Sequence, residues 1–208
     1  LLRERGLDGA IVSSPENCPS LPGSGGHQHT GSRQPGFTLA VMRSDDKAPT
    51  HITTMDFEAA TFRIKSAGLG FVVDPYDTWV GLKTWPEISQ GAVLPDKTRM
   101  ESSADKLEQF VKACDLADKR IGVEMDYLTV PYYNMICEKF PEAQLVDISD
   151  LFVYARSIKT EEEIKMFREL CRIADHGFTQ VSRMAGIGVS EKEMSDCFRE
   201  DVIKSGFC

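Results

Sequence analysis

The four histidines are the side chains of this sequence that could take part in the widest range of chemistry. His27 and His29 are separated by one residue inside a glycine-rich stretch, residues 22–36, whereas His51 and His176 stand apart. Imidazole nitrogens are common ligands of transition metals, so the H-x-H pair is a metal-like arrangement. Such a pair in a glycine-rich loop is weak evidence, and a solvent-exposed or structural role is favoured over contact with a substrate and over metal binding.

Arg33 lies in the same glycine-rich stretch. A guanidinium can hold a carboxylate through two parallel hydrogen bonds, and glycines on either side would give the loop freedom to close. A surface arginine on a flexible loop is favoured over that role. The segment Gly23-Ser24-Gly25-Gly26 lacks the Lys-Ser/Thr ending of a phosphate-binding loop, and no Gly-x-Ser-x-Gly elbow of a serine hydrolase occurs.

The cysteines argue against a structural zinc site and for a reducing compartment. No C-x-x-C pair is present, and several of the cysteines fall in segments with a helical pattern. Buried free thiols are favoured over disulfides, so we expect a cytoplasmic protein. The six are Cys18, Cys114, Cys137, Cys171, Cys197 and Cys208.

Net charge and the length of the apolar runs argue against two classes of partner. The chain has 208 residues, 41% of them hydrophobic and 27% charged, with a formal net charge of -8. That acidity, without a cluster of lysine and arginine, argues against a nucleic-acid surface. The apolar run Phe37–Met42 is far shorter than the roughly 20 residues that a membrane-spanning helix needs. We therefore expect no nucleic acid and no membrane partner.

The first three quarters of the chain alternate between strand and helix patterns. This alternation predicts a layered α/β domain, and a hairpin at residues 44–49 makes the sheet mixed rather than wholly parallel. Strands are expected at 9–13, 37–43, 50–54, 69–73, 120–124 and 145–147, and helices at 56–65, 103–114 and 130–140. A loop that begins at residue 74 is expected to carry Trp85, for which packing in the core is favoured over a pocket or a dimer surface.

The last quarter predicts a pair of helices. Thr160 and Glu163 form a capping box at the start of a long amphipathic helix, and Ser190 and Glu193 repeat the pattern after a glycine-containing break. The first helix carries an apolar stripe over about five turns, which needs a partner surface. The stripe consists of Ile164, Phe167, Cys171, Ala174, Phe178 and Val181.

Three separated regions together resemble the creatinase, prolidase and aminopeptidase P family. They are the run from Leu7 to Asn17, the stretch Ile121–Glu124 with the tyrosines that follow it, and the junction Arg156–Ile164. The resemblance implies a creatinase-type N-terminal domain at residues 1–155. It also implies that residues 156–208 are the truncated start of a pita-bread catalytic domain. The chain departs from the family at 18–23, where an aromatic-rich stretch is expected.

The resemblance further implies what the chain does. It implies an N-terminal substrate-gating and dimerisation domain of a Xaa-Pro metallopeptidase. In dimeric members the loop after the first strand reaches the neighbouring subunit's active site, so Arg33 and His29 are the candidates for contact with a substrate there. No catalytic residue and no metal ligand is expected in this chain, which should be inert alone. Two divalent ions, Mn, Co or Zn, are expected in a peptidase parent.

Two alternatives stay open at this level. A creatinase-type parent would hydrolyse a C–N bond of a small guanidino substrate without metal, and its discriminating residues would lie beyond residue 208. A non-catalytic relative of the same architecture would bind peptides instead. Both share the expected fold and the homodimer.

Overall fold

The structure is a computed structural model that describes residues 1–17, 33, 35–45, 47–78, 85–91 and 101–206. Within these ranges the chain divides into two compact units, Leu1–Val153 and Tyr154–Cys208. The sequence-based boundary at 155/156 remains a prediction about domains.

The first unit is built on a six-stranded mixed sheet in the order β4-β3-β2-β1-β5-β6. β1 pairs with β2 in antiparallel fashion and with β5 in parallel fashion, and β2 is also antiparallel to β3. The β3–β4 and β5–β6 pairs are parallel. The expected mixed α/β sheet is thus confirmed. The strands are β1 Gly9–Val12, β2 Leu39–Arg43, β3 Thr50–Thr53, β4 Phe71–Val73, β5 Arg120–Val123 and β6 Gln144–Asp147.

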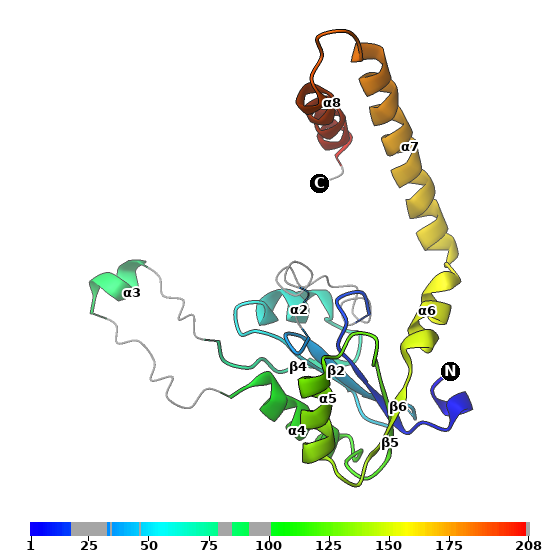
Figure 1. The fold of residues 1–208 in the computed structure, drawn as a ribbon. Coiled ribbons are helices and arrows are strands. Elements are labelled where there is room, and N and C mark those ends of the chain that lie inside the picture. The colour runs from blue at the N-terminus through cyan, green and yellow to red at the C-terminus, as the bar shows by residue number, and fades with distance from the viewer. Residues whose placement is uncertain (18–32, 34, 46, 79–84, 92–100, 207–208) are drawn as a thin grey trace. The chain divides into compact units, whose positions relative to one another are not determined.

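Helices cover both faces of this sheet (Figure 1). Alternating strand residues face opposite sides, so Ile11 of β1 joins the cluster of α4 (Ser103–Ala113) and α5 (Val130–Lys139). Its neighbours Ala10 and Val12 face the other side, toward α6 (Ser149–Ser157) and α2 (Ala59–Lys65). Every residue of β1 is buried, as expected for a strand covered on both faces. The short helices η1 (Arg3–Arg5) and α3 (Trp85–Ser89) complete the unit.

Local sequence explains where these elements begin and how closely they pack. Ser102 and Asp105 form a capping box at the start of α4, and α5 carries a proline in its first turn. Gly122 in β5 allows Ile148 to approach, because a Cβ there would lie 2.7 Å from the Ile148 side chain. Ile148, which leads into α6, therefore lies closer to β5 than a larger side chain at residue 122 would permit.

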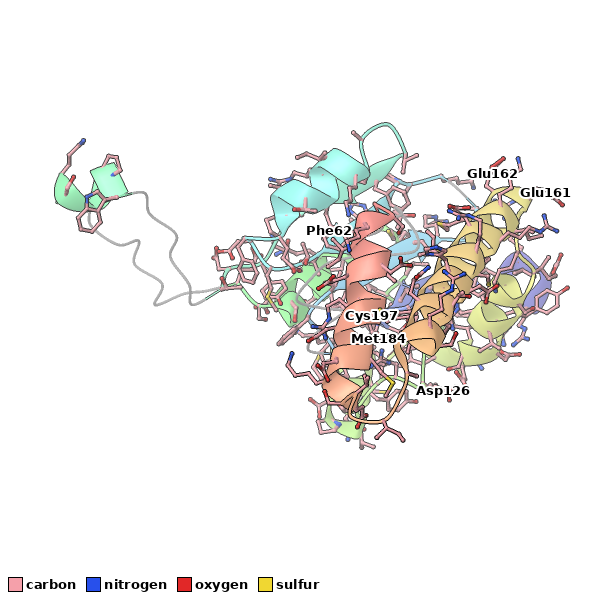
Figure 2. The ribbon with its side chains drawn as sticks, turned by 90° about the horizontal axis from the view of Figure 1, so that it is seen from above. Phe62, Asp126, Glu161, Glu162, Met184 and Cys197 are labelled. Carbon is pink, nitrogen blue, oxygen red and sulfur yellow. The ribbon has the colours of Figure 1, made fainter. Side chains whose placement is uncertain are left out.

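The second unit contains the expected helix pair. α7 (Glu161–Met184) and α8 (Glu191–Lys204) each begin at the predicted capping box, with Thr160 and Ser190 as N-caps. Figure 2 shows Glu161 and Glu162 at the first turn of α7, Met184 at its last turn and Cys197 on α8. The two helices pack through Phe198, whose ring lies 4.9 Å from the Phe178 ring and against Gly177.

The structure corrects three details. No helix is expected between residue 140 and Thr160, whereas α6 lies there and continues to Ser157. Cys171 is exposed although it lies on the apolar stripe, because α8 buries Ile173 and Gly177 instead. Trp85, expected in a loop with core packing favoured, begins α3 and is 77% exposed.

Candidate functional site

The carboxyl ends of five strands meet at one edge of the sheet. β1, β3, β4, β5 and β6 run in the same direction, and among the described strands β2 alone runs the other way. Most of the buried polar side chains of the described chain lie at or just beyond this edge, which we call the carboxyl edge. They are Ser13, Ser14, Asn17, Thr38, Thr53, Thr54, Glu58, Thr78 and Glu124.

Glu124 is the centre of the carboxyl edge. Its side chain is 3% exposed. Its Oε2 atom accepts hydrogen bonds from the backbone N–H groups of Ser13 at 2.6 Å and Ser14 at 2.9 Å. Its Oε1 atom accepts from the Ser14 hydroxyl at 2.8 Å and from the Asn17 side-chain amide. Both oxygens of a buried carboxylate are therefore satisfied by donors from the turn that follows β1.

This network lies where the topology of the sheet switches. From β1 the chain passes to β2 on one side, whereas β5 lies on the other side of β1. In open α/β sheets, the crevice outside the carboxyl ends at such a point is the usual place for a ligand. Glu124 directly follows β5 and Ser13 directly follows β1. The hydrogen bonds of Glu124 therefore join the carboxyl ends of these two neighbouring strands.

The other end of the β1–β2 connection is anchored by aromatic side chains. Gly36 has φ +88°, and a Cβ there would lie 2.5 Å from the ring of Tyr132. The Tyr76 hydroxyl donates to the Phe37 carbonyl at 3.1 Å. Burial raises the pKa of Tyr76 and of Tyr132, which keeps both phenols protonated at neutral pH. Backbone and ring thus pack too closely at this point for a side chain on residue 36.

Arg33 is placed at the carboxyl edge, as part of an ion pair. Its Nη1 atom lies 2.5 Å from Oε1 of Glu16, and the two side chains are 58% and 38% exposed. Arg33 has φ +51°, a left-handed conformation that costs a non-glycine residue roughly 1–2 kcal/mol. His29, the second predicted substrate contact, lies outside the described residues. The substrate-binding role of both remains a prediction.

The pKa of Tyr127 depends on the charged side chains around Arg33. Burial raises the pKa of its phenol, the positive charge of Arg33 opposes that rise, and the negative charges of Glu16 and Glu124 add to it. Tyr127 therefore interacts electrostatically with each of these three charged side chains. They come from the turn after β1, the end of the β1–β2 connection and the segment after β5.

Sequence reasoning identified Arg33 but missed Glu16, Tyr127 and Glu124. A usable signal was present, because Glu124 directly follows one apolar strand and Ser13 and Ser14 follow another. Polar residues at the ends of neighbouring parallel strands meet at one edge. The sequence pattern does not show which strands are neighbours in the sheet.

The carboxyl edge is suited to binding rather than to proton transfer. Glu124 has both oxygens engaged with four donors, whereas the Arg33 guanidinium reaches solvent and can hold an anion. Over the described residues, no three His, Cys, Asp or Glu side chains converge on a position that could hold a metal ion. None of the described helices is long and apolar enough to span a membrane.

Comparison with known proteins identifies the family. The sequence profile of the creatinase/prolidase N-terminal domain matches residues 1–158. An uncharacterized peptidase, YqhT of Bacillus subtilis, is 28% identical over 192 residues, which are 92% of this chain and 43% of YqhT. A creatinase from a Bacillus species is 34% identical over 76 residues, 36% of this chain and 18% of that enzyme.

The fold agrees with these matches. The solved structure of a Xaa-Pro dipeptidase from Bacillus anthracis superposes with a TM-score of 0.64 at 20% identity, covering 98% of this chain and 46% of that one. The chain therefore spans less than half the length of these relatives. Because the family profile covers most of its residues, the chain belongs to the family of creatinase/prolidase N-terminal domains.

Proposed function

We propose that this chain is the N-terminal substrate-gating and dimerisation domain of a Xaa-Pro peptidase-like metallohydrolase. In this proposal residues 156–208 begin a pita-bread catalytic domain, and the two divalent ions, Mn, Co or Zn, are held by residues outside this chain. The chain alone is inert toward peptides. In the homodimer, Arg33 and His29 of one protomer approach a short peptide bound by its partner.

The observation that carries the proposal is the extent of the fold match. The likeness to the Xaa-Pro dipeptidase runs through 98% of this chain, so it includes the helix pair as well as the sheet. At the carboxyl edge, an exposed guanidinium stands beside a rigid buried network. A guanidinium at such a place is chemically suited to the carboxylate of a dipeptide.

The cytoplasmic location belongs to the same proposal. Cys114, Cys137, Cys171 and Cys197 are free thiols, and Cys114 is buried. Burial also raises the pKa of the Cys114 thiol, which keeps it protonated and unreactive. Unpaired cysteines in this number fit a reducing compartment better than a secreted protein.

A creatinase-type amidinohydrolase is the second candidate, favoured by one observation. The identity to the Bacillus creatinase is 34% over 76 residues, whereas the identity to YqhT is 28% over 192 residues. A creatinase parent would present a small guanidino compound to the same edge, and it would need no metal.

The test compares the full-length protein with the 208-residue chain. Each is assayed with glycyl-proline and with creatine, before and after chelation and with Mn²⁺ restored. Metal-dependent cleavage of glycyl-proline by the full-length protein, and none by the chain, is the expected result. Sedimentation of the full-length protein should give the mass of a dimer.

Three outcomes would contradict the proposal in different ways. Metal-independent cleavage of creatine would replace the peptidase with the amidinohydrolase. Lack of both activities in the full-length protein would leave a peptide-binding module. Cleavage by the 208-residue chain itself would show that catalytic residues lie within it.

A further inference from the structure

We propose that Glu16 is a specificity-determining residue, whose carboxylate occupies the Arg33 guanidinium until a carboxylate of the substrate displaces it. This inference rests on the proposed function, because it assigns Arg33 to the recognition of a substrate carboxylate. It adds that the chain itself contains the competitor for that position.

The first argument is geometric. The Glu16 carboxylate contacts Nη1 of Arg33 at 2.5 Å, in the way that an incoming carboxylate would. A guanidinium has five N–H donors in a planar fork, and a bidentate contact uses two of them. Because Glu16 occupies Nη1, a ligand whose two contacts include Nη1 competes with Glu16 for that side of the guanidinium.

The second argument is that Glu16 is held in position. It lies between Ser14 and Asn17, both of which bond to the buried Glu124 carboxylate. The Asn17 N–H also donates to the Ser14 carbonyl at 3.3 Å, which closes the turn around Glu16. The backbone of Glu16 is thus fixed at both sides, so its contact with Arg33 comes from a preorganised turn and not from a free surface chain.

The third argument is accessibility. Glu16 and Arg33 are 38% and 58% exposed, so a ligand can reach the pair without unfolding the edge. Exposed ion pairs contribute little to stability. Opening this pair therefore costs little, whereas the Glu124 network beneath it stays closed.

The fourth argument is charge. Glu16 places its negative charge directly on Arg33, and Glu124 adds a second negative charge close to Tyr127 in the same group. The Glu16 carboxylate repels an anionic ligand of Arg33 unless it turns away. Replacing Glu16 by glutamine removes this charge and this competitor while keeping the shape of the side chain.

The test uses the full-length protein and two substrates that differ only at the carboxylate, glycyl-proline and glycyl-prolinamide. Glu16→Gln should lower KM for glycyl-proline roughly 1.4- to 5-fold, the range set by typical exposed pairs, and leave KM for the amide unchanged. Glu16→Asp, which keeps the charge but retracts it, should fall between wild type and Glu16→Gln. Arg33→Gln should raise KM for the acid alone.

Two controls make the result specific. Glu169→Gln removes a similarly exposed carboxylate, paired with Arg172 at 2.5 Å in the other unit, and changes the net charge equally. It should leave the acid-to-amide ratio of KM at the wild-type value. Combining Glu16→Gln with Arg33→Gln should give the Arg33→Gln value, because without the guanidinium there is nothing for Glu16 to block.

A second readout keeps the inference testable without turnover. In the 208-residue chain, the Arg33 Nε–H resonance is assigned by its loss in Arg33→Gln and followed during titration with sodium acetate. Its shift should occur at a lower acetate concentration in Glu16→Gln than in wild type or Glu169→Gln.

The outcomes separate the two ideas. If glycyl-proline is cleaved but Glu16→Gln leaves the acid-to-amide ratio unchanged, the competitor role is wrong while the peptidase stands. If the full-length protein cleaves neither substrate, the proposed peptidase function is wrong. The acetate titration then tests the competitor role of Glu16 without it. Identical titration curves for wild type and Glu16→Gln would overturn the competitor role.

Discussion

Removal of the Glu124 carboxylate tests whether the carboxyl edge depends on one buried anion. In Glu124→Ala, the N–H groups of Ser13 and Ser14 and the Asn17 amide lose their acceptor, whereas the Ser14 hydroxyl can turn to another partner. Each unsatisfied buried donor costs about 1–2 kcal/mol, so we expect unit 1 to lose about 3–6 kcal/mol of unfolding free energy.

Glu124→Gln should be much milder. The glutamine oxygen can keep the two backbone N–H bonds at the Oε2 position. Its amide group can donate to the Ser14 hydroxyl and to Asn17 after that side chain flips, because Asn17 Oδ1 is buried without a hydrogen-bond partner in the structure. The loss is then the difference between charge-assisted and neutral bonds, about 1–2 kcal/mol in total.

Amide hydrogen exchange of β1 and β5 measures these losses in unit 1 alone, because slowly exchanging core strands report its opening free energy. The exposed Glu142→Ala serves as the control and should stay within about 0.5 kcal/mol of wild type. If Glu124→Ala also stays within 1 kcal/mol, or if Glu124→Gln is as damaging as alanine, the four-donor account of this residue is wrong.

Three further predictions concern backbone strain, acid stability and helix capping. Gly36→Ala combines φ +88° with a Cβ 2.5 Å from Tyr132, so urea unfolding should show a loss of about 2–4 kcal/mol of unfolding free energy. Gly68→Ala has φ +80° but nothing within 4 Å of its Cβ, so it should lose only about 1 kcal/mol. Equal losses would contradict the contact. Lys112 and Lys139 lower the pKa of Glu108 from 4.5 to about 2, so its contribution is present above pH 4.5 and is lost as pH falls toward 2. The melting temperature of Glu108→Gln should therefore fall less steeply than that of wild type over this range, and parallel curves would contradict the pairing. Thr160→Ala should lose about 1 kcal/mol of α7 stability by circular dichroism, whereas Thr179→Ala within the helix should lose none; equal effects would mean that the cap is unimportant.

Much of the fold could be predicted because its signals are local. The capping boxes at Thr160 and Ser190 fixed where α7 and α8 begin, and the strand from Gly9 was recognisable from a short apolar run after a glycine. By contrast, α6 was not predicted. Ser157 carries no helix stop signal, and the Leu151 side chain that docks the helix on the sheet is a tertiary contact.

The site was less predictable than the fold, for a physical reason. Arg33 was identified through the family resemblance and its place in the glycine-rich loop, but its partner Glu16 precedes it by 17 residues, and Glu124, which holds the turn around Glu16, follows Arg33 by 91 residues (124 − 33). Their contact depends on β5 pairing with β1 and not with another strand. No local pattern encodes strand order, so the residues that hold the candidate site remained invisible until the sheet was assembled.

The carboxyl edge combines two interactions that differ in burial, and this difference separates stability from recognition. The Glu124 network is buried and has four donors, so its loss is felt as unfolding free energy. The Glu16–Arg33 pair is exposed, so its loss changes stability little but changes the charge that a ligand meets. Variants of Glu124 should therefore alter hydrogen exchange in β1 and β5, whereas variants of Glu16 should alter affinity for carboxylates. A Glu16 variant that lowered the protection of β1 as much as Glu124→Ala does would show that the edge acts as one structural unit, and that no residue in it is free to respond to a ligand.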